Sequence, residues 1–198
     1  MTLYVESNFL LEIVLGQEES APAEQLLAMA EAKTIDLALP SFALSEPFVR
    51  VRRGVRDRSR LMKQLNDQVT QLARSTPHNL EVGALRAIPN LFATIEQRET
   101  DRLISTVERL LAVARLIELA SSSLRDAMDY RPRYDLEIED AIILALVVAD
   151  LKSQSGTGPH LFANRNIKDF DDPLIVKELK DLNCEAVWSF TDALDQLR

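Results

Sequence analysis

The longest apolar run in the chain, residues 141–149, lies inside a stretch that is too long for a strand. Alanine and leucine are frequent in that stretch, residues 136–151, which therefore predicts a helix buried nearly all round. Nine apolar residues are too few to span a bilayer, which needs roughly 20. Glu137, Glu139 and Asp140 stand at the entrance to the predicted helix, where carboxylates face the positive end of the helix dipole. Each of the three could simply stabilise the start of the helix. A functional role requires other carboxylates of the chain to lie at the same place.

Short β-prone segments alternate with helical segments over most of the chain. The predicted strands are residues 2–5, 35–39, 115–119, 160–163 and 186–190. Helices are predicted between them, and residues 130–135 are predicted to form a loop that leads into the buried helix. This alternation predicts an α/β fold with a mostly parallel sheet covered by helices on both faces.

The centre of the chain has a different pattern. Residues 50–114 are helix-like and polar on one face, with breaks predicted at Thr76-Pro77 and Ile88-Pro89. No repeat, low-complexity tract or interdomain linker is visible in the sequence. We therefore expect one domain, residues 1–198, with a helical insertion over about residues 50–114.

Polar side chains follow several of the predicted strands at the points where the strands end. Glu6-Ser7-Asn8 follows the first strand, and Asn164-Arg165-Asn166 follows the fourth. Glu46 comes shortly after the second strand, and Asp140 lies in the helix just before the fourth. Sites in parallel sheets form beyond the carboxyl ends of the strands, where the strand order reverses. The sequence therefore predicts that these acid and amide groups gather at one edge of the sheet.

The order and spacing of these groups resemble the PIN-domain family. The likeness rests on Glu6-Ser7-Asn8, on the glutamate of PSFALSEPF (Glu46), on the acid of EDAIILA (Asp140), and on NRNIKDF with Asn164, Asn166, Asp169 and Phe170. The matching segments cover roughly residues 2–50 and 115–190. The resemblance implies a three-layer α/β/α fold with a central parallel sheet of about five strands in the order 3-2-1-4-5, in a branch with an extended central helical insertion.

The same resemblance implies a metal-dependent ribonuclease that hydrolyses RNA phosphodiester bonds, as toxin-like members of the family do. It assigns Glu6, Glu46 and Asp140 as ligands of Mg²⁺ or Mn²⁺, and Asn166 as the fourth member of the catalytic set. Carboxylates suit such hard cations, which activate water and neutralise charge developing on a phosphate. The residues expected to surround and orient the ligands are Ser7, Asn8, Asn164 and Asp169.

Two positions depart from the family pattern. The first acid is Glu6, where aspartate is common, and the fourth position is Asn166, where an aspartate is frequent. An amide can ligate a metal or bind a water but brings no charge, and Asp169 could supply the missing one. A PIN-like module that binds RNA or a protein without cutting is therefore the alternative function. Asn8, taken alone, is expected to cap the first helix.

The charge is distributed unevenly along the chain. The net charge of −8 argues against a general attraction to nucleic acid. Residues 50–75, however, carry eight bases and two acids, a net charge of +6. Arginine forks bind phosphate, and this segment follows Glu46 closely, so it is a candidate RNA-binding surface. The predicted RNA-binding residues are Arg50, Arg52, Arg53 and Arg56.

Other partners are open as well. The basic segment could instead contact an acidic, antitoxin-like protein chain, and a homodimer is a further possibility. Cys184 is the one cysteine, so no internal disulfide forms, which suits a reducing compartment. The start of the chain lacks the features of a signal peptide. We therefore expect a cytoplasmic protein with no membrane segment.

Overall fold

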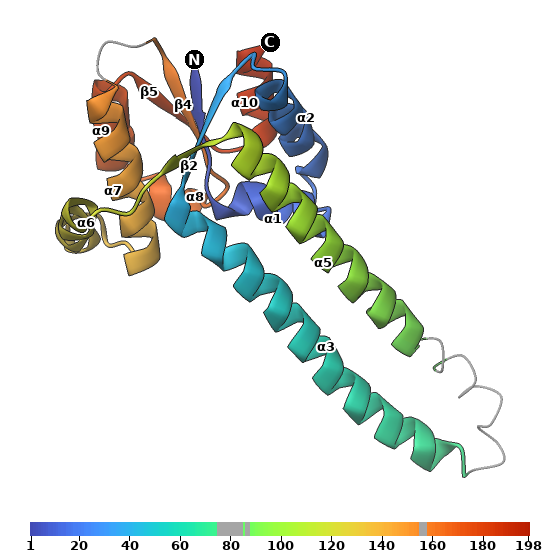
Figure 1. The fold of residues 1–198 in the computed structure, drawn as a ribbon. Helices are drawn as coiled ribbons and strands as arrows, with labels where there is room; N and C mark the ends of the chain where they lie inside the picture. The colour runs from blue at the N-terminus through green and yellow to red at the C-terminus, as the bar shows by residue number, and fades with distance from the viewer. Residues whose placement is uncertain (75–84, 86–87, 155–157) are drawn as a thin grey trace.

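The computed structural model describes residues 1–74, 85, 88–154 and 158–198 (Figure 1). In chain order its elements are β1 (Thr2–Tyr4), α1 (Ser7–Leu15), α2 (Ser20–Glu31), β2 (Asp36–Pro40), η1 (Ser41–Leu44), α3 (Ser45–Leu72), α5 (Ile88–Val113), β3 (Arg115–Ile117), α6 (Ser121–Tyr134), α7 (Ile138–Ser153), β4 (His160–Ala163), α8 (Ile167–Phe170), α9 (Pro173–Asp181), β5 (Cys184–Val187) and α10 (Phe190–Leu197). The predicted break at Thr76-Pro77 lies outside the described residues.

The strands form one parallel sheet in the order β3-β2-β1-β4-β5. This confirms the predicted α/β class and strand order. Leu3 of β1 lies opposite Leu37 of β2 on one side and Leu161 of β4 on the other. The chain builds the sheet outward from β1 in one direction and then returns to add β4 and β5 on the other side. The strand order therefore reverses between β1 and β4, which is where α/β proteins place their ligands.

Helices cover the sheet on both faces (Figure 1). Helices α1, α2 and α10 pack together on one face with one end of α5, while α7 and α9 cover the other face and α6 packs against α7. The three inner strands, β1, β2 and β4, are buried almost throughout. Burial on both faces explains why these strands read as apolar runs rather than as alternating patterns.

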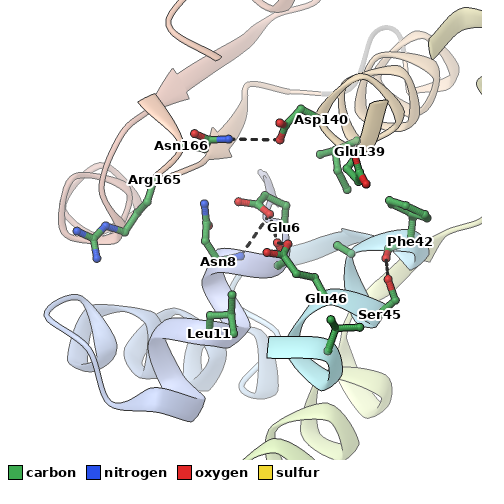
Figure 2. A pocket seen from close by; sticks show the side chains of 14 residues that line it. Glu6, Asn8, Leu11, Phe42, Ser45, Glu46, Glu139, Asp140, Arg165 and Asn166 are labelled. Carbon is green, nitrogen blue, oxygen red and sulfur yellow. Dashed lines mark hydrogen bonds between the residues drawn. The ribbon is translucent and has the colours of Figure 1, made fainter. Parts of the chain in front are cut away.

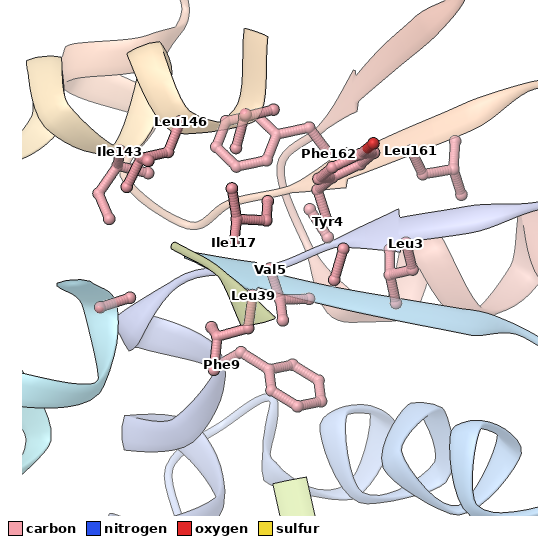
Figure 3. Close-up of a cluster of buried hydrophobic side chains, with 14 of the residues drawn as sticks. Leu3, Tyr4, Val5, Phe9, Leu39, Ile117, Ile143, Leu146, Leu161 and Phe162 are labelled. Carbon is pink, nitrogen blue, oxygen red and sulfur yellow. The ribbon is translucent and has the colours of Figure 1, made fainter. Parts of the chain in front are cut away.

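Helix α7 is the predicted buried helix, and its apolar run faces the sheet. Ile143 and Leu146 of this helix lie with Phe162 of β4 and Ile117 of β3 in one apolar cluster (Figure 3). Phe9 of α1 is part of the same core, on the opposite side of the sheet (Figure 3). Each large side chain of this kind contributes roughly 1.5–3 kcal/mol of burial free energy. The core thus fixes both the sheet and the helix that carries Asp140 at its start.

Helices α3 and α5 form an antiparallel pair that projects away from the sheet (Figure 1). The base of this pair packs on α1, where Val51 and Leu103 form a small apolar cluster with Val14. Further out, Arg58 of α3 makes two hydrogen bonds to the carboxylate of Glu99 of α5, at 2.5 and 3.3 Å. Helix α5 falls in the segment for which an insertion is predicted, and α3 begins at Ser45, shortly before it. The assignment of the whole chain to one domain stays a prediction.

The structure corrects two boundaries that the sequence predicted. Residues 130–135 are not a loop, because α6 continues to Tyr134 with Pro132 inside it. The hydroxyl groups of Tyr130 and Tyr134 both donate to Glu178 of α9, and these contacts favour the helix over the loop that proline suggested. The last strand ends at Val187 rather than at residue 190, because Ser189 caps α10 by accepting from the backbone N–H of Asp192 at 2.9 Å.

No helix in the described part of the chain is long and apolar enough to cross a membrane.

Candidate functional site

A cavity of about 720 Å³ opens at the carboxyl edge of the sheet, beside the point where the strand order reverses. It is lined by side chains from several separate elements, as Figure 2 shows. The predicted catalytic set is among them, namely Glu6, Glu46, Asp140 and Asn166. Residues that are up to 160 positions apart, such as Glu6 and Asn166, therefore line one cavity. Parallel strands bring this about because their carboxyl ends all reach the same edge.

Glu6 and Glu46 are joined through a single hydroxyl group. Glu6 ends the extended segment after β1 and is the N-cap of α1, and it is only 7% exposed. The hydroxyl of Ser7 lies 2.5 Å from a carboxylate oxygen of Glu6 and 2.5 Å from one of Glu46. A serine hydroxyl has one proton to donate. Two carboxylates held this close to one donor therefore favour a shared proton or a cation.

Asp140 approaches from the opposite side, at the first turn of α7. Its Oδ1 atom accepts a hydrogen bond of 3.3 Å from the Asn166 amide, which follows β4 (Figure 2). Asp169, in the short helix α8, does not line the cavity but lies close enough for its charge to act on Asp140. Asp169 therefore adds a carboxylate near the site, although the resemblance places the fourth catalytic position at Asn166.

The pKa values of two carboxyl groups report this crowding. Burial, opposed by hydrogen bonds from Ser7 and Asn8, and the charges of Glu46 and Asp140 together raise the pKa of Glu6 to about 7. Burial and the charge of Asp169 raise the pKa of Asp140 to about 6, although the Asn166 amide acts in the opposite direction. Burial is the larger cause of both shifts, and the neighbouring carboxylates add to it.

Asn8 and Asn164 connect α1 to the end of β4. The Asn8 amide donates to Oδ1 of Asn164 at 2.8 Å, and the backbone N–H of Asn166 donates to the same oxygen at 2.7 Å. Asn8 does not cap α1 as predicted, because Glu6 takes that position and accepts from the Asn8 backbone at 3.3 Å. Oδ1 of Asn8 is buried and has no hydrogen-bond partner in the described part of the protein. A buried acceptor at the cavity wall is available to a water molecule or to a ligand.

The cavity also includes residues that were not predicted to belong to the site. Glu139 lines it beside Asp140 and is exposed. Arg165 lies on the opposite rim, near Asn8, where the buried carboxylate of Glu12 holds its guanidinium group and Glu18 lies 3.5 Å away (Figure 2). Both residues adjoin predicted site residues in sequence. The sequence therefore places both residues next to the site, but it does not show which way their side chains point.

The four predicted RNA-binding arginines are all exposed on α3, but they do not share one side of the helix. Arg52 lines an apolar groove between α3 and α5. Arg53 and Arg56 are spaced four and seven residues from Val49, which lines the cavity, and so continue its helical face. Arg50 does not line the cavity. None of the four lines the cavity itself, and their role in RNA binding stays a prediction.

The donor set suits a hard divalent cation that is only partly enclosed by protein. Among the described residues, no three acid, histidine or cysteine side chains lie close enough to form a complete metal cage. Mg²⁺ is usually held by one or two carboxylates together with waters and substrate phosphates, so such a cage is not required. The raised pKa values of Glu6 and Asp140 and the free acceptor of Asn8 fit this kind of site.

Comparisons with known proteins add little. No protein-family model matches the chain, and no curated protein sequence matches it. A solved structure, the crystal structure of VapBC2 from Rickettsia felis bound to a DNA fragment from their promoter, is similar with a TM-score of 0.47 and 12% sequence identity. The alignment covers 94% of this chain and 99% of that chain. Similarity at this level assigns neither a family nor an activity to the protein.

Proposed function

We propose that the protein is a divalent-metal-dependent endoribonuclease of the PIN-like type. The observation that supports this most strongly is the convergence of Glu6, Glu46 and Asp140, from β1, α3 and α7, on one open cavity at the strand-order reversal. Glu6 is buried, Asp140 is half-buried and Glu46 is exposed, and like charges brought together in this way favour a cation that compensates for their repulsion.

Glu6, Glu46 and Asp140 would hold Mg²⁺ or Mn²⁺, directly or through water. When bound, the ion lowers the pKa of a water molecule and neutralises charge that develops on the phosphate. Other side chains of the site position these carboxylates. The Ser7 hydroxyl lies between the carboxylates of Glu6 and Glu46 and donates its one proton to one of them, and so holds the two groups close together. The Asn166 amide orients the carboxylate of Asp140.

Asn164 and Asn8 hold the two sides of the site together. Asn164 is fully buried and accepts hydrogen bonds from both Asn8 and the backbone of Asn166. This keeps the start of α1 and the end of β4 at a fixed separation. Asp169 adds negative charge behind Asp140 and so raises the attraction of the site for a cation.

The second candidate function is binding of RNA without cleavage, and Asn166 is the observation that favours it. An amide at this position leaves the cavity with one charge fewer than an aspartate would give, and weaker metal binding follows. The same basic face could alternatively bind an acidic protein partner.

Cleavage of labelled single-stranded RNA with Mg²⁺ or Mn²⁺ tests the proposal, together with Mn²⁺ calorimetry. Wild type should cut, and Asn166→Asp should bind Mn²⁺ at least tenfold more tightly and cut faster, because the substitution restores a charge at almost constant size. Asn166→Ala is the matched control and should not gain affinity. If wild type and Asn166→Asp both leave every RNA intact with either ion, the enzyme function is wrong.

A further inference from the structure

A row of cations runs along α3 on the side of the helix that faces the candidate site. Glu46 and Val49 line the cavity at the start of this helix. Steps of three and four residues keep side chains on one helical face. Such steps continue outward from Val49 through Arg53, Arg56, Arg60 and Lys63, while Arg50 and Arg52 lie at the same kind of step from Glu46 and Val49 and flank the start of this series. We call Arg53, Arg56, Arg60 and Lys63 the α3 row.

The α3 row is exposed and largely unpaired. Each of its side chains is exposed, and no carboxylate of the described residues pairs with Arg53, Arg56 or Lys63. Arg60 lies 3.8 Å from Asp57, but both side chains are more than half exposed, at 77% and 61%. Exposed pairs of this kind contribute little. The row therefore keeps its positive charge available to a ligand.

Other arginines of α3 have different surroundings. Arg58 points to α5, where it is bound to Glu99, and Arg52 lines the apolar groove between the two helices. Arg58 is thus taken up by a contact within the helix pair, whereas no carboxylate of the described residues holds Arg53, Arg56 or Lys63 in this way. The row begins next to the cavity and runs outward along the helix pair that projects from the sheet (Figure 1).

We infer that the α3 row holds the phosphate backbone of an RNA strand that leaves the candidate site along α3, so that the protein selects strands long enough to reach Lys63. The inference rests on the proposed function, because it takes the cavity as the place where the strand is cut. Arginine forks and lysine both bind phosphate strongly. The row is a local excess of positive charge on a chain of net charge −8, and such an excess attracts polyanions.

The length of the row sets the length of the strand. Seventeen residues separate Glu46 from Lys63, which is about 26 Å at the helical rise of ~1.5 Å per residue. A stacked strand advances ~3.4 Å per nucleotide, so about eight nucleotides are needed to contact the whole row from the cavity. A strand of about four nucleotides fills the cavity and leaves most of the row without a contact.

RNA fits this row better than an acidic protein chain does. Beyond Val49 the row offers no apolar or aromatic side chain, whereas tight protein interfaces depend on buried anchors of that type. The row also leads into a cavity lined by carboxylates, which repels the acidic side chains of a protein. A phosphodiester strand belongs in such a cavity when a divalent cation lies between the two.

Binding measurements with Ca²⁺ in place of Mg²⁺ or Mn²⁺ test the inference without depending on catalysis, because Ca²⁺ binds carboxylates but accepts a looser geometry than Mg²⁺. Fluorescence anisotropy compares single-stranded RNAs of about 4 and about 12 nucleotides. The variants are Arg53→Gln/Arg56→Gln in the row and Arg125→Gln/Arg131→Gln on α6, whose side chains are exposed and do not line the cavity, with equal loss of charge. Wild type should bind the longer RNA at least tenfold more tightly. The row variant should lose most of that difference, and its slope of log K against log salt should flatten by about 1.4, from ~0.7 per phosphate contact. The control variant should change affinity less than twofold.

The outcomes separate this inference from the proposed function. Equal binding of the two lengths, or equal loss in both double variants, overturns the row as an RNA guide. Displacement of the longer RNA by poly-glutamate as readily as by unlabelled RNA of equal length overturns it in favour of an acidic protein partner. If the longer RNA binds more tightly through the row but is not cleaved with Mn²⁺, the proposed nuclease function is wrong and the RNA-binding role of the row is supported. Cleavage of both lengths at equal rates rejects the row and supports the nuclease.

Discussion

At the scale of single residues, the carboxyl group of Glu6 lowers the stability of the fold at high pH and is also a proposed metal ligand. It caps α1, is nearly buried, shares the Ser7 hydroxyl with Glu46, and lies in the field of Asp140. Its pKa is about 7, against an ordinary value of 4.5. The folded state therefore holds the Glu6 proton more tightly than the unfolded state does. Stability linked to Glu6 is present at low pH and is lost as the pH rises from about 4.5 to about 7.

Glu6→Gln should therefore stabilise the metal-free protein at high pH. Glutamine keeps the size of the side chain and removes the buried charge. With EDTA present, we expect the Tm of the variant to exceed that of wild type by several degrees at pH 8, and the gain to disappear near pH 4.5. Thermal unfolding followed by circular dichroism at both pH values measures this. A gain of equal size at both pH values would show that the carboxyl charge of Glu6 is not the cause.

Asp140→Asn should remove nuclease activity and leave the fold intact. Asparagine keeps the size of the side chain and its ability to accept from Asn166, so stability should not fall, and at pH 8 it should rise because a carboxylate with a raised pKa is removed. The lost charge should lower RNA cleavage under Mn²⁺ by ~100-fold or more. Glu137→Gln is the matched control, because Glu137 begins the same helix but is exposed and does not line the cavity. A loss of stability as large as the loss of activity would support a purely structural role for Asp140.

At the scale of the elements, one partly exposed ion pair connects the edge strand to the principal helix. Arg115 of β3 donates to both carboxylate oxygens of Asp150 of α7, at 2.5 and 2.8 Å, and the Tyr4 hydroxyl donates to the same group at 2.6 Å. Asp150→Asn should lower the free energy of unfolding by about 1–3 kcal/mol, because one acceptor charge serves two donors from different strands. Urea unfolding measures this. Asp181→Asn is the control, since its pair with Lys177 is exposed and should be worth less than about 0.5 kcal/mol. Equal losses would show that Asp150 does not connect the elements.

The sequence predicts most of the elements and the place of the site for one physical reason. The strand that ends before Glu6 and the apolar helix that begins at Asp140 are both strongly patterned, and parallel strands share one carboxyl edge. Convergence of the acids then follows from topology. What the sequence could not show depends on side-chain direction and distant contacts.

Three features illustrate that limit. Helix α6 continues past Pro132 because Tyr130 and Tyr134 bind Glu178, about 45 residues further along the chain. Arg165 reaches the cavity rim because Glu12 holds it from α1. Glu6, rather than Asn8, caps α1, because the Asn8 side chain donates instead to Asn164, which follows β4. In each case a contact between distant segments decides between local alternatives that are nearly equal.

At the scale of the whole molecule, the α3–α5 pair should be separable from the sheet and its site. The pair is anchored at its base by Val51 and Leu103 and by the contact of Arg58 with Glu99, while Leu61 and Leu91 further out are 52% and 56% exposed. Replacement of residues 62–95 by a short Gly/Ser linker should therefore leave the Tm within a few degrees of wild type. Cleavage of short RNA should persist. Loss of folding in this variant, seen by circular dichroism, would contradict the view that the outer part is an insertion on a complete domain.

The central claim is that Glu6, Glu46 and Asp140 form one metal site, and a crystal structure with Mn²⁺, using the anomalous signal of manganese, tests it most directly. We predict one Mn²⁺ in the cavity, with oxygens of at least two of these carboxylates within about 2.0–2.6 Å and the third bound directly or through water. A clear manganese peak elsewhere, or an empty cavity at a Mn²⁺ concentration at which the protein is stable, would contradict the claim.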